Sequence, residues 1–201
     1  LIQGELREVK LTDSAEGPFA RVAVIGLGKR AEFDAEKLRR VTALAGQRAE
    51  AAGCASVNVW LAREACNAAG GARRAGEAAA EGALLGGYRF QQHKSKPKVQ
   101  KLATLLLSGD GADFAEGAER GRALAAANAF ARDLQNQPGN LMRPREMALA
   151  AQKVARRSPR ISCKVLDTAA LKKLGMGARL GVAVGSDEPP AFVHLVYKPR
   201  G

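Results

Sequence analysis

The segment RDLQNQPGNLMRPREMA, residues 132–148, constrains the fold of this chain more than any other stretch. Gln137 precedes a proline and is therefore displaced from the α region, so the alanine-rich helix upstream must end near it. Pro144 suits the first turn of a new helix, which we expect to run to about Arg157. The sequence thus predicts a tight joint between two helices.

Upstream of this joint, short β-branched stretches alternate with stretches of helical spacing. The first predicted helix begins after Asp34, an N-cap preceded by Phe33 as a staple residue, and ends at Gly53. Gly86 and Gly87 end the second helix. We predict strands at 21–27, 56–61 and 102–107, the first and third of them buried, helices at 34–52 and 72–87, and a polar loop at 91–98.

The longest predicted helix runs from about residue 113 to 136. Asp113 and Glu116 at its start resemble a capping box. Its apolar residues recur on a single helical face, which consists of Leu124, Ala127, Ala131 and Leu134. We expect this helix to lie between two α/β units rather than inside one.

Beyond the joint the same alternation continues. The helix that starts at Pro144 has an apolar stripe made of Met147, Ala150, Ala151 and Val154. We predict strands at 161–165, 180–184 and 191–197, with a short helix that ends at Gly175. Strands and helices alternate throughout, so the predicted class is α/β with largely parallel or mixed sheets.

The composition excludes several classes of protein. No apolar run approaches the roughly 18 residues of a membrane span, and no basic stretch followed by an apolar run marks a signal peptide at the N-terminus. The first residue is leucine, which suggests a truncated or trimmed product. The cysteines are widely spaced without a CxxC pair, which favours free thiols in a reducing compartment, the cytoplasm; they are Cys54, Cys66 and Cys163.

The chain is strongly basic, with a formal net charge of +12. Such an excess can attract nucleic acid or acidic partners. The basic residues are scattered, however, and no aromatic residues interleave with them as a stacking platform. We therefore favour a solubilising role, or compensation by an acidic part of the same protein, over nucleic-acid binding.

A possible nucleotide-binding pattern occurs in VAVIGLGKRA, residues 22–31, which contains G-x-G-x-x-A after a strand. In a phosphate cradle the glycines lead directly into a helix. Here residues 29–33 intervene before Asp34, and the first acidic residue after the second strand is Glu64, inside the next segment. We favour a plain strand–turn–helix junction.

No group of residues forms a convincing catalytic constellation. His194 lies in an otherwise apolar strand, and His93 lies in a basic loop. Asp187 and Glu188 are adjacent in a turn that ends in proline, which suits turn geometry better than paired acid–base chemistry. Two histidines are too few for a histidine-based zinc site. We predict no catalytic, cofactor-binding or metal-ligating residue in this chain.

The joint resembles the entry into the catalytic domain of the leucyl aminopeptidase family, peptidase family M17. The residues that match the family's Asn-x-Pro-x-Asn-x-x-x-Pro pattern are Asn136, Pro138, Asn140 and Pro144. Residues 24–40, 81–98 and 174–199 also resemble family segments, in the family's order. Arg143 departs from the pattern, because the family usually has threonine there; its loss removes a side-chain N-cap worth about 1 kcal/mol.

The resemblance implies a macro-like N-terminal domain, probed here by residues 1–110, a linking helix at 111–136, and the first strands and helices of an α/β metallopeptidase catalytic domain at 137–201. In the family, two zinc or manganese ions activate a bridging water and release an N-terminal amino acid such as leucine from a peptide. The family assembles as a cytoplasmic homohexamer. Its metal ligands and catalytic residues follow the stretch that ends here, so no site residue can be transferred.

Two functions are therefore expected from the sequence. In the first, the chain is part of a leucyl aminopeptidase, inactive alone and dependent on a missing C-terminal catalytic segment. In the second, it is a non-catalytic DNA-binding or assembly module, as some bacterial members of the family regulate DNA and the charge of +12 is compatible with that.

Overall fold

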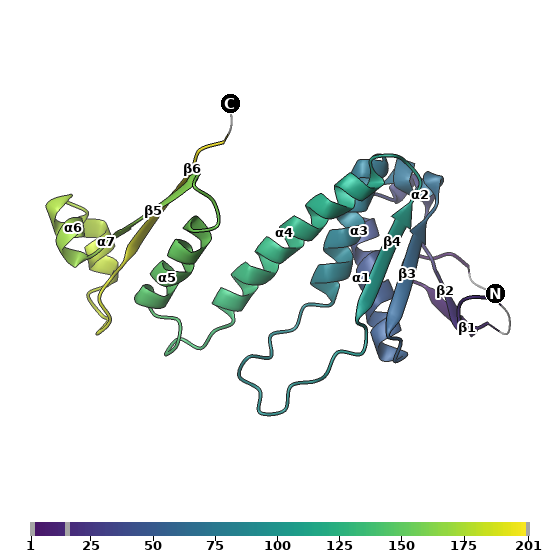
Figure 1. The fold of residues 1–201 in the computed structure, drawn as a ribbon, viewed down its shortest axis with the longest axis horizontal. Coiled ribbons are helices and arrows are strands. Elements are labelled where there is room, and N and C mark those ends of the chain that lie inside the picture. The colour runs from purple at the N-terminus through teal and green to yellow at the C-terminus, as the bar shows by residue number, and fades with distance from the viewer. Residues whose placement is uncertain (1–2, 15–16, 200–201) are drawn as a thin grey trace. The chain divides into compact units, whose positions relative to one another are not determined.

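The computed structural model describes residues 3–14 and 17–199 and divides the chain into two compact units, Leu1–Arg132 and Asp133–Gly201 (Figure 1). Both units combine helices with paired strands, so the predicted α/β class is confirmed. One strand pair is parallel and two are antiparallel. None of the helices in the described ranges is long and apolar enough to cross a membrane.

The first unit contains two separate strand pairs. Strands β1 (Val9–Asp13) and β2 (Arg21–Ile25) form an antiparallel hairpin, and β3 (Ser56–Leu61) pairs with β4 (Thr104–Gly109) in parallel. The prediction that β2 is buried is wrong, since Val22 and Val24 are 47% and 52% exposed. A hairpin of two strands covers neither of its own faces. The sequence did not predict β1, whose residues VKLTD lack a regular apolar alternation.

The strands β3 and β4 are half-buried rather than fully buried. Val57 and Val59 share the less exposed face of β3, as predicted. In β4 the same alternation turns Leu106 outward while Leu105 and Leu107 are partly covered, so the predicted buried strand is corrected to a one-sided one. Helices α1 (Ala35–Ala51) and α3 (Ala72–Gly86) lie beside this pair in Figure 1.

The ends of α1 follow the sequence prediction closely. The Asp34 carboxylate accepts a hydrogen bond from the Lys37 backbone N–H at 2.8 Å, as an N-cap does. Phe33 and Leu38 both lie in the buried core, where a staple pair places them. Gly53 has φ +74°, the left-handed conformation that ends many helices. The core continues through Leu61, Cys66, Phe114 and the alanines of α3.

Glycines let the helices of the first unit approach each other closely. A Cβ atom on Gly82 of α3 would overlap the Arg39 carbonyl oxygen and the Thr42 hydroxyl of α1. A Cβ on Gly117 in α4 (Phe114–Gln135) would overlap the Arg73 carbonyl oxygen of α3. Because no side chain separates these backbones, the small-residue composition becomes a close helix packing.

The buried face of α4 is not the one marked by its larger apolar residues. Leu124 is 41% exposed, and Ala127 and Ala131 are also exposed. The residues that are buried are Phe114, Gly117, Gly121 and Ala125. Close approach to α3 requires the glycine edge of the helix, which therefore outweighs the edge that carries leucine.

The second unit contains α5 (Pro144–Ala155), β5 (Ile161–Leu166), α6 (Thr168–Lys173), α7 (Gly177–Val182) and β6 (Phe192–Tyr197). Strands β5 and β6 pair antiparallel, with Ile161 opposite Tyr197. The strand predicted at 180–184 is wrong, because α7 occupies most of it and Val182 and Val184 are 87% and 83% exposed. A short apolar run fits either helix or strand by periodicity alone. The turn at 185–190 therefore connects a helix to β6, not two strands.

Candidate functional site

The joint at residues 136–144 is built as the sequence predicts. Helix α4 ends at Gln135, and the backbone N–H groups of Leu141 and Met142 donate to the Pro138 carbonyl oxygen at 2.8 and 2.9 Å. Helix α5 then begins at Pro144, which stands in its first turn. The two prolines thus bracket a compact turn that reverses no hydrogen-bonding pattern of either helix.

Arg143 connects this joint to the turn at 185–190. It occupies the N-cap position of α5 but makes no side-chain capping hydrogen bond, as expected from the loss of a threonine. Its guanidinium instead donates to the Asn140 carbonyl oxygen at 3.0 Å and forms an ion pair with Glu188 at 3.1 Å. Glu188 is therefore engaged in a structural ion pair within the second unit, not paired with Asp187 for acid–base work.

The other chemically interesting residues stay apart. His194 is exposed on β6, opposite Lys164 of β5, and His93 lies near the Phe90 ring, 5.7 Å between ring centroids. Burial raises the pKa of the Cys66 thiol, which keeps it protonated and unreactive. In residues 3–14 and 17–199, no three His, Cys, Asp or Glu side chains cluster in a way that could hold a metal ion.

The glycine pattern at 26–31 forms a packing turn. Gly26 is buried, and a Cβ there would overlap the Glu5 carbonyl oxygen. Gly28 has φ +76° and is followed by the short 3₁₀ helix η1 (Arg30–Glu32) before the cap at Asp34. The glycines thus contact the N-terminal segment and no long helix starts at them, which supports the junction favoured from the sequence.

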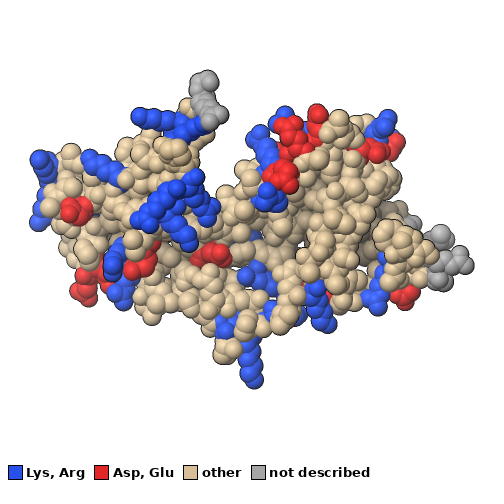
Figure 2. Space-filling view, in the orientation of Figure 1, with Lys and Arg blue, Asp and Glu red and all other residues tan. Residues whose placement is uncertain are grey.

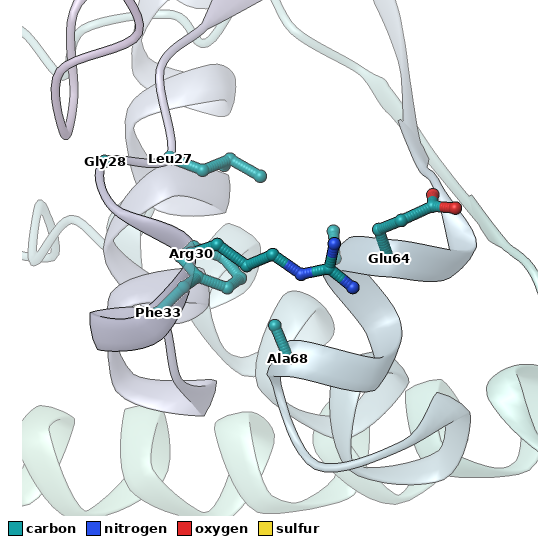
Figure 3. A pocket seen from close by; sticks show the side chains of 7 residues that line it. Leu27, Gly28, Arg30, Phe33, Glu64 and Ala68 are labelled. Carbon is teal, nitrogen blue, oxygen red and sulfur yellow. The ribbon is translucent and has the colours of Figure 1, made fainter.

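The same turn lines a hollow that sequence reasoning missed (Figure 3). The hollow measures about 160 Å³ and lies between this turn and the short helix α2 (Arg63–Ala68). Its lining residues are Leu27, Gly28, Arg30, Phe33, Glu64, Ala65 and Ala68. The only sequence signal was the position of Glu64 just after the second strand, because nothing local indicates that α2 approaches the turn.

Comparison with known proteins now places the chain in a family. Residues 1–97 match the N-terminal domain of the cytosol aminopeptidase family, and residues 129–201 match the catalytic domain of the same family. The chain belongs to the cytosol aminopeptidase family. The resemblance to the leucyl aminopeptidases, family M17, is thus confirmed, with the N-terminal domain preceding the start of the catalytic domain.

Individual members of the cytosol aminopeptidase family agree with this assignment. A probable cytosol aminopeptidase of Solibacter usitatus (strain Ellin6076) is 38% identical over 98% of this chain and 40% of its own length. One of Aquifex aeolicus (strain VF5) is 35% identical over 90% of this chain and 35% of its own length. The chain thus spans about 40% or less of the length of these curated relatives.

Two solved structures share the fold. The bottromycin maturation enzyme BotP superposes with a TM-score of 0.84 at 27% identity, covering 98% of this chain and 42% of BotP. A mutant tomato leucine aminopeptidase superposes with a TM-score of 0.83 at 25% identity, covering 98% of this chain and 39% of that enzyme. BotP has also been solved in complex with Mn. The fold is therefore that of the M17 N-terminal domain and the start of its catalytic domain.

Proposed function

We propose that this chain is part of a metal-dependent aminopeptidase that removes N-terminal amino acids such as leucine from peptides. One observation carries the proposal: an N-terminal domain and a catalytic domain of one peptidase family match in order along a single chain. Residues 1–110 form the macro-like domain, 111–136 the linking helix, and 137–201 the beginning of the catalytic domain. The relatives' name also supports a cytoplasmic location.

Two divalent metal ions, zinc or manganese, serve the proposed reaction. A relative's structure with Mn supports divalent metal use. The described residues of this chain do not fit such a centre, because no three potential ligands come together in them. We therefore assign the chain a supporting role: it shapes the entry to the catalytic domain at Arg143 and Glu188 and supplies no ligand.

The proposal is tested by complementation. The 201-residue chain is co-expressed with the part of the Solibacter usitatus relative's catalytic domain that lies beyond the region matched here. With manganese or zinc added, the mixture should hydrolyse leucine-p-nitroanilide, whereas the chain alone should not. Hydrolysis by these 201 residues alone would contradict the proposal. A homohexamer, which we also propose for the assembled enzyme, would be seen as a sixfold mass by light scattering.

Binding to DNA is the second candidate function. In the described part of the second unit, only Arg143 among the basic residues forms an ion pair. Arg160 and Lys198 lie side by side there, joined by a backbone hydrogen bond of 2.9 Å. Figure 2 shows Lys and Arg side chains spread over the visible face with acidic side chains among them. A gel shift that weakens as salt rises would support this function, and no shift at low salt would remove it.

A further inference from the structure

The hollow beside η1 has an apolar floor and a charged rim. Phe33 and Ala65 at its base are buried and belong to the core of the first unit, and Leu27 packs against that core. Arg30 and Glu64 are exposed and come from opposite walls, one from η1 and the other from α2. The hollow thus combines an apolar base with one positive and one negative group.

The two charged groups have no partner in the described parts of the chain. The acidic and basic neighbours of Arg30 are engaged with each other, because Lys29 and Lys37 both pair with Glu32. Arg30 and Glu64 make no ion pair with each other within 4.0 Å, although both line the same hollow. In Figure 3 the Arg30 side chain reaches across the mouth toward α2, past the Ala68 methyl group.

The dimensions restrict the ligand to a small molecule. A volume of about 160 Å³ is below the usual range for drug-sized ligands, roughly 300–1,000 Å³. A guanidinium recognises a carboxylate, a carboxylate recognises an ammonium group, and an apolar floor recognises a hydrocarbon side chain. A free α-amino acid with an apolar side chain carries these three groups on one carbon atom.

We propose that this hollow is a binding site for a free apolar amino acid such as leucine, with Arg30 holding its carboxylate and Glu64 its ammonium group. The amino acid's side chain lies over Phe33 and Ala65. Such an amino acid is the product of the proposed aminopeptidase, so the site would report product level to the N-terminal domain. Only that regulatory meaning depends on the proposed function, since binding itself does not.

The site is tested with the 201-residue chain, labelled with ¹⁵N and titrated with L-leucine. We expect saturable shifts at the amides of residues 27–33 and 64–68, with a dissociation constant of about 1–10 mM for so small and open a site. Leucinamide lacks the carboxylate and 4-methylpentanoate lacks the ammonium group, so each should bind more weakly. Equal binding of 4-methylpentanoate and leucine would overturn the role of Glu64.

Three variants separate the contributions. Arg30→Gln should weaken leucine binding about 5-fold, and Glu64→Gln should weaken it similarly while leaving 4-methylpentanoate unaffected, since each loses one exposed charge-assisted contact. Ala68→Leu should fill the hollow and abolish binding without unfolding the chain. Arg122→Gln on α4, which loses a surface ion pair with Glu119, is the matched control and should bind as the parent does.

The outcomes against the proposal are equally specific. The absence of saturable shifts at these amides, or an affinity that neither Arg30→Gln nor Glu64→Gln changes, overturns the site. Because the readout is binding by the chain itself, these results are independent of whether the complemented enzyme hydrolyses peptides.

Discussion

The two units of this chain are stabilised in different ways. The first has a contiguous core in which α1, α3 and α4 bury alanines, glycines and a few large side chains such as Leu38 and Phe114. In the described part of the second unit, only Ala148, Leu166 and Leu171 are buried. Its strands, turns and caps therefore contribute a larger share of its stability than they do in the first unit.

The largest expected effect tests the two cores directly. Leu38→Ala removes a fully buried side chain from the dense core of the first unit and should cost about 3–4 kcal/mol. Leu171→Ala removes an equally buried side chain from the second unit, whose thinner surroundings can relax, and should cost about 2 kcal/mol. Native-state hydrogen exchange measures each unit separately. Equal costs in the two units would contradict the difference in packing.

A smaller effect is expected where helix backbones touch. Gly82→Ala places a methyl group against the Arg39 carbonyl oxygen and should destabilise the first unit by about 1–3 kcal/mol despite the better helix propensity of alanine. Gly46→Ala is the matched control, a buried glycine of α1 whose added Cβ would meet Leu105 at an ordinary 3.7 Å. It should be neutral or stabilise by up to about 1 kcal/mol. Urea unfolding followed by the fluorescence of Trp60 measures both.

Local sequence signals predicted the helix ends and the joint well. The cap at Asp34, the left-handed Gly53 and the start of α5 at Pro144 depend on residues within one turn of each other, so the sequence contains their whole explanation. The family assignment was likewise available from the spacing of Asn136, Pro138 and their neighbours.

What the sequence did not predict depends on contacts between distant segments. The buried edge of α4 is set by Gly117 against α3, and no local pattern reveals that partner. The run at 180–184 is apolar but has no sheet to join, so it is helical. The hollow beside Arg30 requires α2 to approach a turn more than 30 positions earlier in the chain.

An intermediate effect is expected from acid. The Glu50 carboxylate accepts hydrogen bonds from the Leu102 and Lys101 backbone N–H groups at 2.8 and 3.0 Å. The Leu102 bond is the main cause that lowers the pKa of Glu50 below its ordinary 4.5, and the Lys37 bond likewise lowers the pKa of Asp34 below 3.8. A carboxyl group with a lowered folded-state pKa stabilises fully above its unfolded pKa and loses that contribution as the pH falls through the folded value.

The first unit should therefore lose stability as the pH falls below about 4.5, the ordinary value for glutamate. Glu50→Gln should reduce the slope of unfolding free energy against pH in that range, measured by urea unfolding at closely spaced pH values. Glu77→Gln, whose carboxylate binds Arg120 on α4, is the control and should keep the parent slope. An unchanged slope in Glu50→Gln would remove the assigned role of its two backbone hydrogen bonds.

The smallest expected effect concerns the joint, where a lost cap and a gained ion pair oppose each other. Arg143→Thr should restore the side-chain cap of α5 and be about 1 kcal/mol more stable than Arg143→Ala, which has neither interaction. Glu188→Gln in the parent should cost only about 0.2–1 kcal/mol, because both charged groups are partly exposed. The parent and Arg143→Thr should therefore differ by less than about 1 kcal/mol. Hydrogen exchange should show these changes in the second unit alone, and Glu188→Gln should have no effect in either Arg143 variant, because the pair it breaks is already absent there.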